Sequence, residues 1–236
     1  MMKEMKAAST CTDEAVAQDA GGRVLIVTSV APERDAILRG LQQHPQFDVI
    51  IGGVGVASAA ARTARALTLA NSSHYRLVIC AGIGGGFPEQ AEIGSLVVAS
   101  DIIAADLGAE TPEGFISLDE LGFGSARIPV DAELVARATA ALQAANLPAR
   151  SGPVLTVATV TGSAATAAHM AVRIPGAAVE AMEGYGVATA AHEFGLPVLE
   201  LRSISNAVGP RDRAAWRIQE ALESLEAASA VLTEVL

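Results

Sequence analysis

Three polar side chains stand where an α/β protein could place a ligand. Glu33 follows the apolar run 23–29 at the expected start of a helix, and Asn206 comes directly after the apolar run 196–205. Ligands of open α/β sheets bind beyond the carboxyl ends of the strands, so these two side chains should meet at one edge of a sheet. Glu183 stands at the mouth of another expected helix, where its carboxylate could accept hydrogen bonds from a vicinal diol such as ribose.

Each acid also has a simpler interpretation. Negative side chains are common in the first turn of a helix because they interact favourably with the helix dipole, and this alone could explain Glu33 or Glu183. However, Gly184 and Gly186 follow Glu183, and each glycine inside a helix costs about 1 kcal/mol relative to alanine. These glycines favour the close approach of a ligand or of a neighbouring helix. Glu180 could support the same site or face solvent.

Two glycine-rich segments also follow expected strands. "GGVGVAS" (52–58) has Ser58 at the third glycine of the dinucleotide fingerprint, and no acid stands near the end of the next strand, so NAD binding is not favoured. In "CAGIGGGF" (80–87), Gly84 and Gly85 would let a flat ligand or an anion approach the backbone. The segment lacks the lysine of a P-loop, so triphosphate chemistry is not indicated.

Length and composition favour one globular domain without a membrane span or a nucleic-acid surface. The chain has 236 residues, of which 51% are hydrophobic, but no apolar run approaches the roughly 20 residues that a spanning helix needs. The net charge is −10, which disfavours nucleic acid as a partner. We expect a flexible N-terminal extension over 1–21, without the apolar segment of a signal peptide, and a single domain over 22–236 in a cytoplasmic protein.

The cysteines and histidines do not predict a disulfide or a metal site. Cys11 lies in the expected extension, while Cys80 lies in an apolar strand pattern where a thiol usually acts as a small hydrophobic side chain. The four histidines are scattered without the spacing of metal ligands. We therefore expect no metal and no cofactor.

Alternating apolar strands and alanine-rich helical stretches predict the fold class. The expected strands are 23–29, 47–53, 76–82, 95–106, 152–160 and 196–205. The expected helices are 32–43, 56–70, 131–146, 181–195 and 212–235. This order predicts an α/β protein, a three-layer α/β/α sandwich with a mostly parallel, mixed central sheet. Residues 107–128 interrupt the alternation and are longer than an ordinary connection, which favours a functional loop.

Several of these motifs, in their order along the chain, resemble the nucleoside phosphorylase/hydrolase family. They are "VTS" with Glu33 behind it, "AGIGGG", "VTGSAA", "AVEAMEGYG" and "ELRSISN". The family includes purine nucleoside phosphorylases and methylthioadenosine/S-adenosylhomocysteine nucleosidases, and the resemblance covers about residues 23–236. Residues 106–115 and 205–222 are most similar to a branch that removes hypoxanthine from a nucleoside with a carboxyphenyl ketone at its 5′ end.

The resemblance implies a role for each matching residue. Glu33 would orient and activate the attacking water, and Met182 and Glu183 would pack under the ribose and accept its hydroxyls. Gly84 and Gly85 would border the base and the sugar. Thr161 and Thr166 would belong to a loop that closes over the purine.

Asn206 stands where the adenine-specific nucleosidases have an aspartate. An amide donates hydrogen bonds but does not give up a proton at neutral pH. Its NH₂ group could bridge N7 and O6 of a 6-oxopurine, which are both acceptors, whereas adenine presents an amino donor at C6. The resulting polar mismatch favours hypoxanthine over adenine.

The 5′ carboxylate implied by this branch needs an apolar wall and a cation. Trp216 and either Arg211 or Arg213 lie in a suitable segment. Alternatively, the two arginines are a solvated pair that flanks Asp212, with Asp212 as the cap of the last helix.

Three other functions stay open at this point. A methylthioadenosine/S-adenosylhomocysteine nucleosidase would release adenine. A phosphorylase would need a cation and hydroxyls beside the glycine segment, which contributes Ile83 and no cation, although another subunit could supply an arginine. A non-catalytic module would bind the nucleoside without releasing its base. The family resemblance also implies a homodimer or a larger homo-oligomer.

Overall fold

The computed structural model describes residues 22–70 and 74–236, so the expected extension over 1–21, with Cys11, lies outside the described residues. The strands are β1 (Arg23–Thr28), β2 (Phe47–Ile51), β3 (Tyr75–Gly86), β4 (Leu96–Ala104), β5 (Gly108–Thr111), β6 (Gly114–Ser117), β7 (Arg127–Pro129), β8 (Ala149–Thr156), β9 (Val179–Ala181) and β10 (Val198–Ala207). The helices are α1 (Ala31–Leu41), α2 (Val56–Ala70), α3 (Leu118–Leu121), α4 (Ala132–Ala144), α5 (Ala164–Arg173), α6 (Gly184–Glu193) and α7 (Ile218–Leu232), with a 3₁₀ turn at Arg213–Ala215.

The central sheet is mixed, and part of it closes on itself. Its strands run in the order β10-β4-β8-β9-β3-β1-β2, with β7 beside β4 and a further pairing between β10 and β3. That pairing makes a closed circuit of β3, β10, β4, β8 and β9. The pairs β1–β2, β1–β3, β10–β3, β4–β8 and β8–β9 are parallel, whereas β10–β4, β3–β9 and β4–β7 are antiparallel. The predicted α/β class with a mixed sheet is confirmed.

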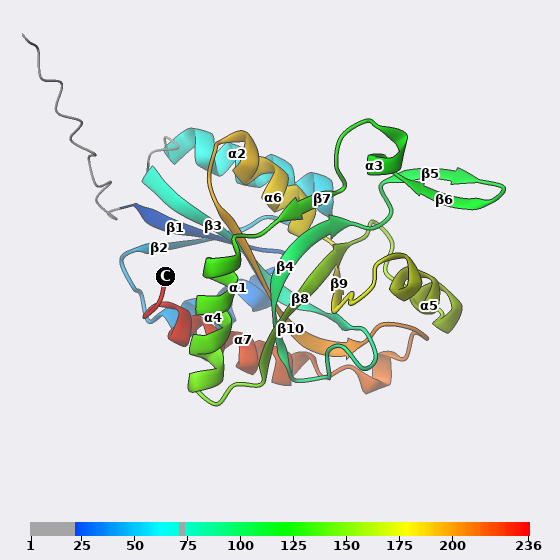
Figure 1. Ribbon diagram of the computed structural model, residues 1–236. Coiled ribbons are helices and arrows are strands. Elements are labelled where there is room, and N and C mark those ends of the chain that lie inside the picture. The colour runs from blue at the N-terminus through cyan, green and yellow to red at the C-terminus, as the bar shows by residue number, and fades with distance from the viewer. Residues whose placement is uncertain (1–21, 71–73) are drawn as a thin grey trace, which may run out of the picture.

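Helices cover this sheet in two groups. Helix α2 packs against α6, while α1 packs against α7, and α4 lies over β4 and β8 and also contacts α7 (Figure 1). The apolar strand residues between these groups are buried, as the alternation of elements predicts. None of the described helices is both long and apolar enough to cross a membrane.

The glycine-rich segment was expected to follow a strand, but it belongs to the strand. Strand β3 continues through Gly86, and β10 pairs with it along this length. The glycines are needed for close packing: a Cβ on Gly82 would lie 2.5 Å from Oε1 of Glu33, and one on Gly84 would lie 2.7 Å from Cγ1 of Val179. The glycines that were expected after the strand therefore form its carboxyl-terminal part.

Other elements also differ from the predictions. The short strand β9 and helix α5 were missed, and helix α7 begins at Ile218 instead of 212 because residues 213–215 form a separate 3₁₀ turn. The long segment 107–128 is not an open loop, since it contains the β5–β6 hairpin, helix α3 and part of β7. Figure 1 shows this hairpin projecting from the body of the protein.

Candidate active site

One cavity of about 420 Å³ gathers most of the predicted site residues. It lies where the ends of β3, β9 and β10 meet the beginnings of α1 and α6. The predicted residues that line it are Glu33, Gly84, Gly85, Thr161, Met182, Glu183, Asn206, Arg211 and Trp216. Two predicted residues, Thr166 and Arg213, are not among its lining residues. The same is true of every residue in the segment 107–128.

Glu33 is held at the cavity by three backbone N–H groups. Its Oε2 accepts hydrogen bonds from Ser29 (2.9 Å) and Val30 (3.2 Å), and its Oε1 accepts one from Ile83 (2.9 Å). The bond from Val30 belongs to the capping of α1, so Glu33 does stabilise its helix. The bond from Ile83 ties the same carboxylate to β3. A carboxylate has about four acceptor positions, so one is left for a water molecule.

Glu183 faces the cavity instead of capping its own helix. It is the N-cap residue of α6, but its side chain makes no capping hydrogen bond. Oε1 accepts from the N–H of Gly55 (3.2 Å) and Oε2 from the N–H of Met182 (3.3 Å). Simple helix capping therefore does not explain this glutamate. About one acceptor position is left for a substrate hydroxyl once Arg202, at 3.4 Å, is counted.

A buried arginine, which the sequence analysis missed, stands behind these acids. The guanidinium of Arg202 donates from Nε to Glu200 (2.8 Å) and from Nη1 to the carbonyl of Ile83 (3.2 Å). Its Nη2 donates to Sγ of Cys80 (3.1 Å) and forms the ion pair with Glu183. We call Glu33, Glu183, Glu200 and Arg202 the buried acid cluster. Its members are each buried, and Arg202 itself is only 1% exposed.

Three acids share this one cation, so the cluster carries an excess of acid. Burial raises the pKa of Glu200, although the neighbouring Arg202 acts in the opposite direction. Oε2 of Glu200 has no hydrogen-bond partner in the structure. A proton on that oxygen removes one of the excess negative charges. This lowers the free energy of the folded state, because an uncompensated buried charge is far more costly than a buried polar group. Burial also raises the pKa of the Cys80 thiol.

The glycines at the start of α6 make room for this cluster and for a neighbouring helix. A Cβ on Gly184 would lie 2.0 Å from Oε2 of Glu200, and one on Gly186 would lie 2.2 Å from the carbonyl oxygen of Val56. The cost of both glycines is thus offset by the close approach of a protein group. Of the two alternatives that the sequence left open, the neighbouring helix explains Gly186.

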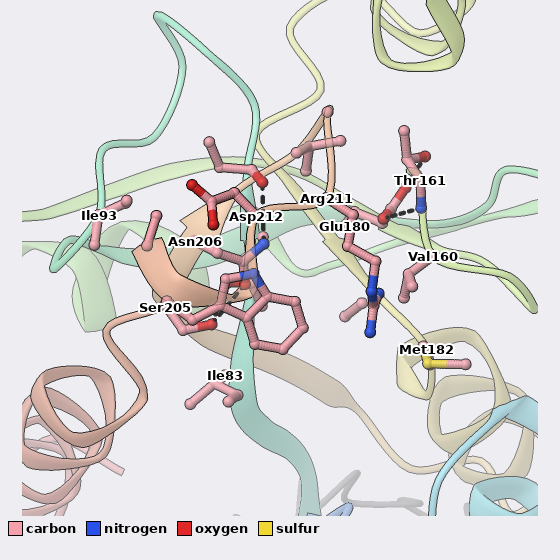
Figure 2. A pocket seen from close by; sticks show the side chains of 18 of the residues that line it. Ile83, Ile93, Val160, Thr161, Glu180, Met182, Ser205, Asn206, Arg211 and Asp212 are labelled. Carbon is pink, nitrogen blue, oxygen red and sulfur yellow. Dashed lines mark hydrogen bonds between the residues drawn. The ribbon is translucent and has the colours of Figure 1, made fainter. Parts of the chain in front are cut away.

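Asn206 lies within β10 and has an oriented amide. Its Oδ1 accepts from the hydroxyl of Ser205 (2.8 Å), and its Nδ2 donates to the carbonyl of Ala207 (3.0 Å). Figure 2 shows both interactions. Because an amide nitrogen carries two hydrogens, one N–H is left to donate into the cavity.

Thr161 reaches the cavity as predicted, and it does so together with Glu180. The backbone N–H of Thr161 donates to Oε1 of Glu180 (2.8 Å), and its hydroxyl donates to Oε2. Glu180 lines the cavity and is only 6% exposed, so it does not face solvent. Burial raises the pKa of Glu180, and the two contacts with Thr161 oppose that shift.

Only one of the two predicted arginines lines the cavity. The guanidinium of Arg211 lies 5.2 Å from the ring centroid of Trp216, within the range of a cation–π interaction. Asp212 accepts from the N–H of Ala214 (3.0 Å), so it caps the 3₁₀ turn and not the last helix. The arginine pair is therefore divided: Arg211 lines the cavity, and Arg213 belongs to the exposed turn.

Thr166 was expected to close over the base, but it lies in the first turn of α5. Its N–H donates to the side chain of Ser163, the N-cap of that helix.

Arg202 and Glu200 were missed, but the pattern "LELRS" could have revealed them. Residues two apart in a strand share a face, so this pattern indicates an opposite-charge pair in a buried strand. Within 22–70 and 74–236, no group of three or more His, Cys, Asp or Glu side chains is arranged to hold a metal ion.

Comparisons with known proteins identify the family. Residues 10–236 match the family model described as the phosphorylase superfamily. The chain is 51% identical to futalosine hydrolase from Streptomyces coelicolor, over 90% of this chain and 96% of that protein. It is 48% identical to futalosine hydrolase from Acidothermus cellulolyticus, over 88% and 89% of the two chains.

A solved structure has the same fold. A futalosine hydrolase mutant of Helicobacter pylori superposes with a TM-score of 0.76 at 18% identity, over 91% of this chain and 100% of that one. The family model spans nearly the whole sequence, including Glu33, Glu183 and Asn206, which line one cavity. This chain therefore belongs to the phosphorylase superfamily of nucleoside phosphorylases and nucleosidases.

Proposed function

We propose that this protein hydrolyses the N-ribosidic bond of futalosine and releases hypoxanthine. The observation that carries the proposal is that Glu33, Glu183 and Asn206 line one cavity in a chain 51% identical to a futalosine hydrolase. On the same basis, we place the reaction in the menaquinone route that uses futalosine.

The three residues would divide the work between the two halves of the substrate. Water attacks the anomeric carbon while the bond to N9 breaks, and Glu33 accepts the proton of that water. Glu183 accepts a hydrogen bond from a ribose hydroxyl, and its negative charge stabilises the positive charge that develops on the sugar. The free N–H of Asn206 donates to the departing base, whose negative charge grows as the bond breaks.

Arg211 and Trp216 would receive the carboxyphenyl end of futalosine. The guanidinium offers a charged hydrogen-bond donor for the carboxylate, and the indole offers an apolar wall. Their contact through the ring face keeps both groups on the same side of the cavity. Arg213 is not required for this role.

Water is favoured over phosphate as the nucleophile because the cavity has little cationic lining. Arg211 is the one Arg, Lys or His among the described residues that line it. Arg202 lies nearby, but its guanidinium is already bound by Glu200, Ile83, Cys80 and Glu183. A phosphorylase would need a free cation at the sugar end.

The decisive assay follows free base from futalosine, inosine and methylthioadenosine, with and without phosphate. We expect release of hypoxanthine from futalosine without phosphate. Turnover that depends on phosphate would indicate a phosphorylase, and binding without release would indicate a non-catalytic module. Adenine release from methylthioadenosine at a comparable rate would also contradict the proposal.

The proposal includes a cytoplasmic homodimer or larger homo-oligomer formed by a single domain over 22–236. The family resemblance supports the association, and the exposed apolar side chains Phe123 (79% exposed) and Val54 (55% exposed, at the cavity) are candidates for its contact surface. Sedimentation of the purified protein tests the oligomeric state, and fractionation of producing cells tests the location.

A further inference from the structure

Glu180 has no role in the reaction described above, yet it is buried in the same cavity as Asn206. Strand β9 contributes three residues to the sheet, and Glu180 is the central one. Its carboxylate contacts Thr161, and no cation forms an ion pair with it among the described residues. Because a carboxylate has about four acceptor positions, about two remain for a ligand.

The sheet places Glu180 and Asn206 on either side of a single glycine. Gly85 of β3 pairs with Glu180 of β9 and also with Asn206 of β10. Side chains of residues paired across neighbouring strands project to the same face of a sheet. The two Cα positions are thus separated by two strand spacings, about 10 Å. Figure 2 shows Glu180 beside Thr161 on one side of the cavity and Asn206 beside Ser205 on the other.

Gly85 keeps the space between the two side chains open. A Cβ at that position would lie 3.1 Å from Nδ2 of Asn206 and 3.0 Å from Cγ2 of Val208. With no side chain there, a flat bicyclic ring can lie over the strand and be reached from both sides. One side offers an N–H donor, and the other offers a carboxylate acceptor.

We propose that Glu180 is a specificity-determining residue that accepts a hydrogen bond from N1–H of the 6-oxopurine base. This inference rests on the proposed function, because hypoxanthine is the base that would be released. Hypoxanthine presents acceptors at N7 and O6 and a donor at N1, which complements Asn206 on one side and Glu180 on the other. Adenine has a bare acceptor at N1, which would face the carboxylate without a hydrogen between them.

The test compares wild type with Glu180→Gln on futalosine and on its counterpart with an amino group at C6. The amide oxygen of glutamine can still accept from N1–H, but the acceptor is no longer charged, so kcat/KM for futalosine should fall by about tenfold. The amide of the variant can donate to N1 of the 6-amino base, so the ratio of the two kcat/KM values should shift by at least that factor. A ratio unchanged from wild type, in a variant with unaltered thermal unfolding, would overturn the assignment.

The matched control is Glu193→Gln, the same change at an exposed position of α6. It should leave the ratio as in wild type. A ratio that shifts equally in this control would remove the argument for Glu180.

Calorimetric binding of free hypoxanthine and free adenine separates the two proposals. If wild type prefers hypoxanthine and Glu180→Gln loses that preference, the inference stands even where futalosine is not hydrolysed. If futalosine is hydrolysed but the variant binds both bases as wild type does, the function stands and the inference fails.

Discussion

The buried acid cluster and the segment 209–216 border the same cavity but are built in different ways. In the cluster, Glu33, Glu183 and Arg202 are bound to backbone groups from β3, from the turn before α1 and from the segment before α2. In the segment, Arg211 and Asp212 are exposed. Their observed contacts, with Trp216 and Ala214, are with residues close to them in the chain. In the proposed function, the end of the cavity that receives the sugar is thus fixed before substrate arrives, whereas the end that receives the carboxyphenyl group is a surface turn.

This difference follows from what each end must do. Charge develops on the sugar during bond cleavage, and groups that stabilise it act best when they need no rearrangement. The carboxylate of the proposed substrate stays charged throughout, so binding it at the segment 209–216 would require one cation and no fixed network. The comparison predicts that changes in the cluster affect folding and turnover, whereas changes in the segment affect binding alone.

The largest effect is expected from Arg202→Leu. It leaves Glu183 and Glu200 buried without their cation, which should lower the free energy of unfolding by about 3–5 kcal/mol. For a chain of this size, the melting temperature should fall by about 10 °C. Thermal unfolding measures the effect, with Arg211→Leu as the matched change in segment 209–216. Equal losses in the two variants would break the comparison.

Glu183→Gln should come next and should affect turnover more than folding. The amide keeps the shape of the side chain but removes the charge that faces the sugar, so kcat should fall by about 10²- to 10³-fold. Steady-state kinetics with futalosine measures this, and Glu193→Gln on the same helix is the control. Near-normal turnover would remove the ribose assignment.

A smaller effect, confined to binding, is expected from Arg211→Ala. Loss of one charged hydrogen bond at an exposed position should raise KM for futalosine by about tenfold while kcat changes little. Arg213→Ala, the neighbouring arginine outside the cavity, should leave KM as in wild type. If the two variants behave alike, Arg211 has no special place at the outer end.

The smallest effect concerns pH and Glu200. Its pKa is raised above the ordinary 4.5, so above pH 4.5 the folded state binds more protons than the unfolded state. Stability contributed by this group is therefore present at low pH and is lost as pH rises through the folded pKa. The Glu200→Gln variant has no ionisable group at this position, so it does not lose this stability as pH rises.

Urea unfolding from pH 4.5 to 8 measures the difference in unfolding free energy between Glu200→Gln and wild type. That difference should move in favour of the variant as pH rises, and the matched Glu193→Gln should show no such trend. A difference that is independent of pH would show that Glu200 keeps its charge throughout the range.

The same contrast between local and distant contacts explains what the sequence could predict. The α/β class followed from the period of apolar residues, which each segment carries by itself. Strand β9 was missed because its three residues are recognisable only through their pairing with β3 and β8. The continuation of β3 through Gly86 was missed for a similar reason, since glycines usually end a strand and here are required by packing against Glu33 and Val179.

The candidate site divides along the same line. Asn206 was chosen because it ends an apolar run and Glu183 because of the glycines behind it, whereas Glu33 was chosen through the family resemblance. Arg202 lies inside such a run, and its partners Glu183 and Ile83 are far from it in the chain. Thr166 was placed in a loop because alanine-rich α5 was not recognised.

The contact between Gly184 and Glu200 limits the order in which these two residues can be substituted. Since a Cβ at 184 would meet Oε2 of Glu200 at 2.0 Å, alanine at 184 is acceptable only after residue 200 has become smaller. Shortening Glu200 first removes a partner of Arg202 but leaves room at the helix. The two substitutions are therefore non-additive, and only one of the two mutational routes to the double variant passes through a well-packed intermediate.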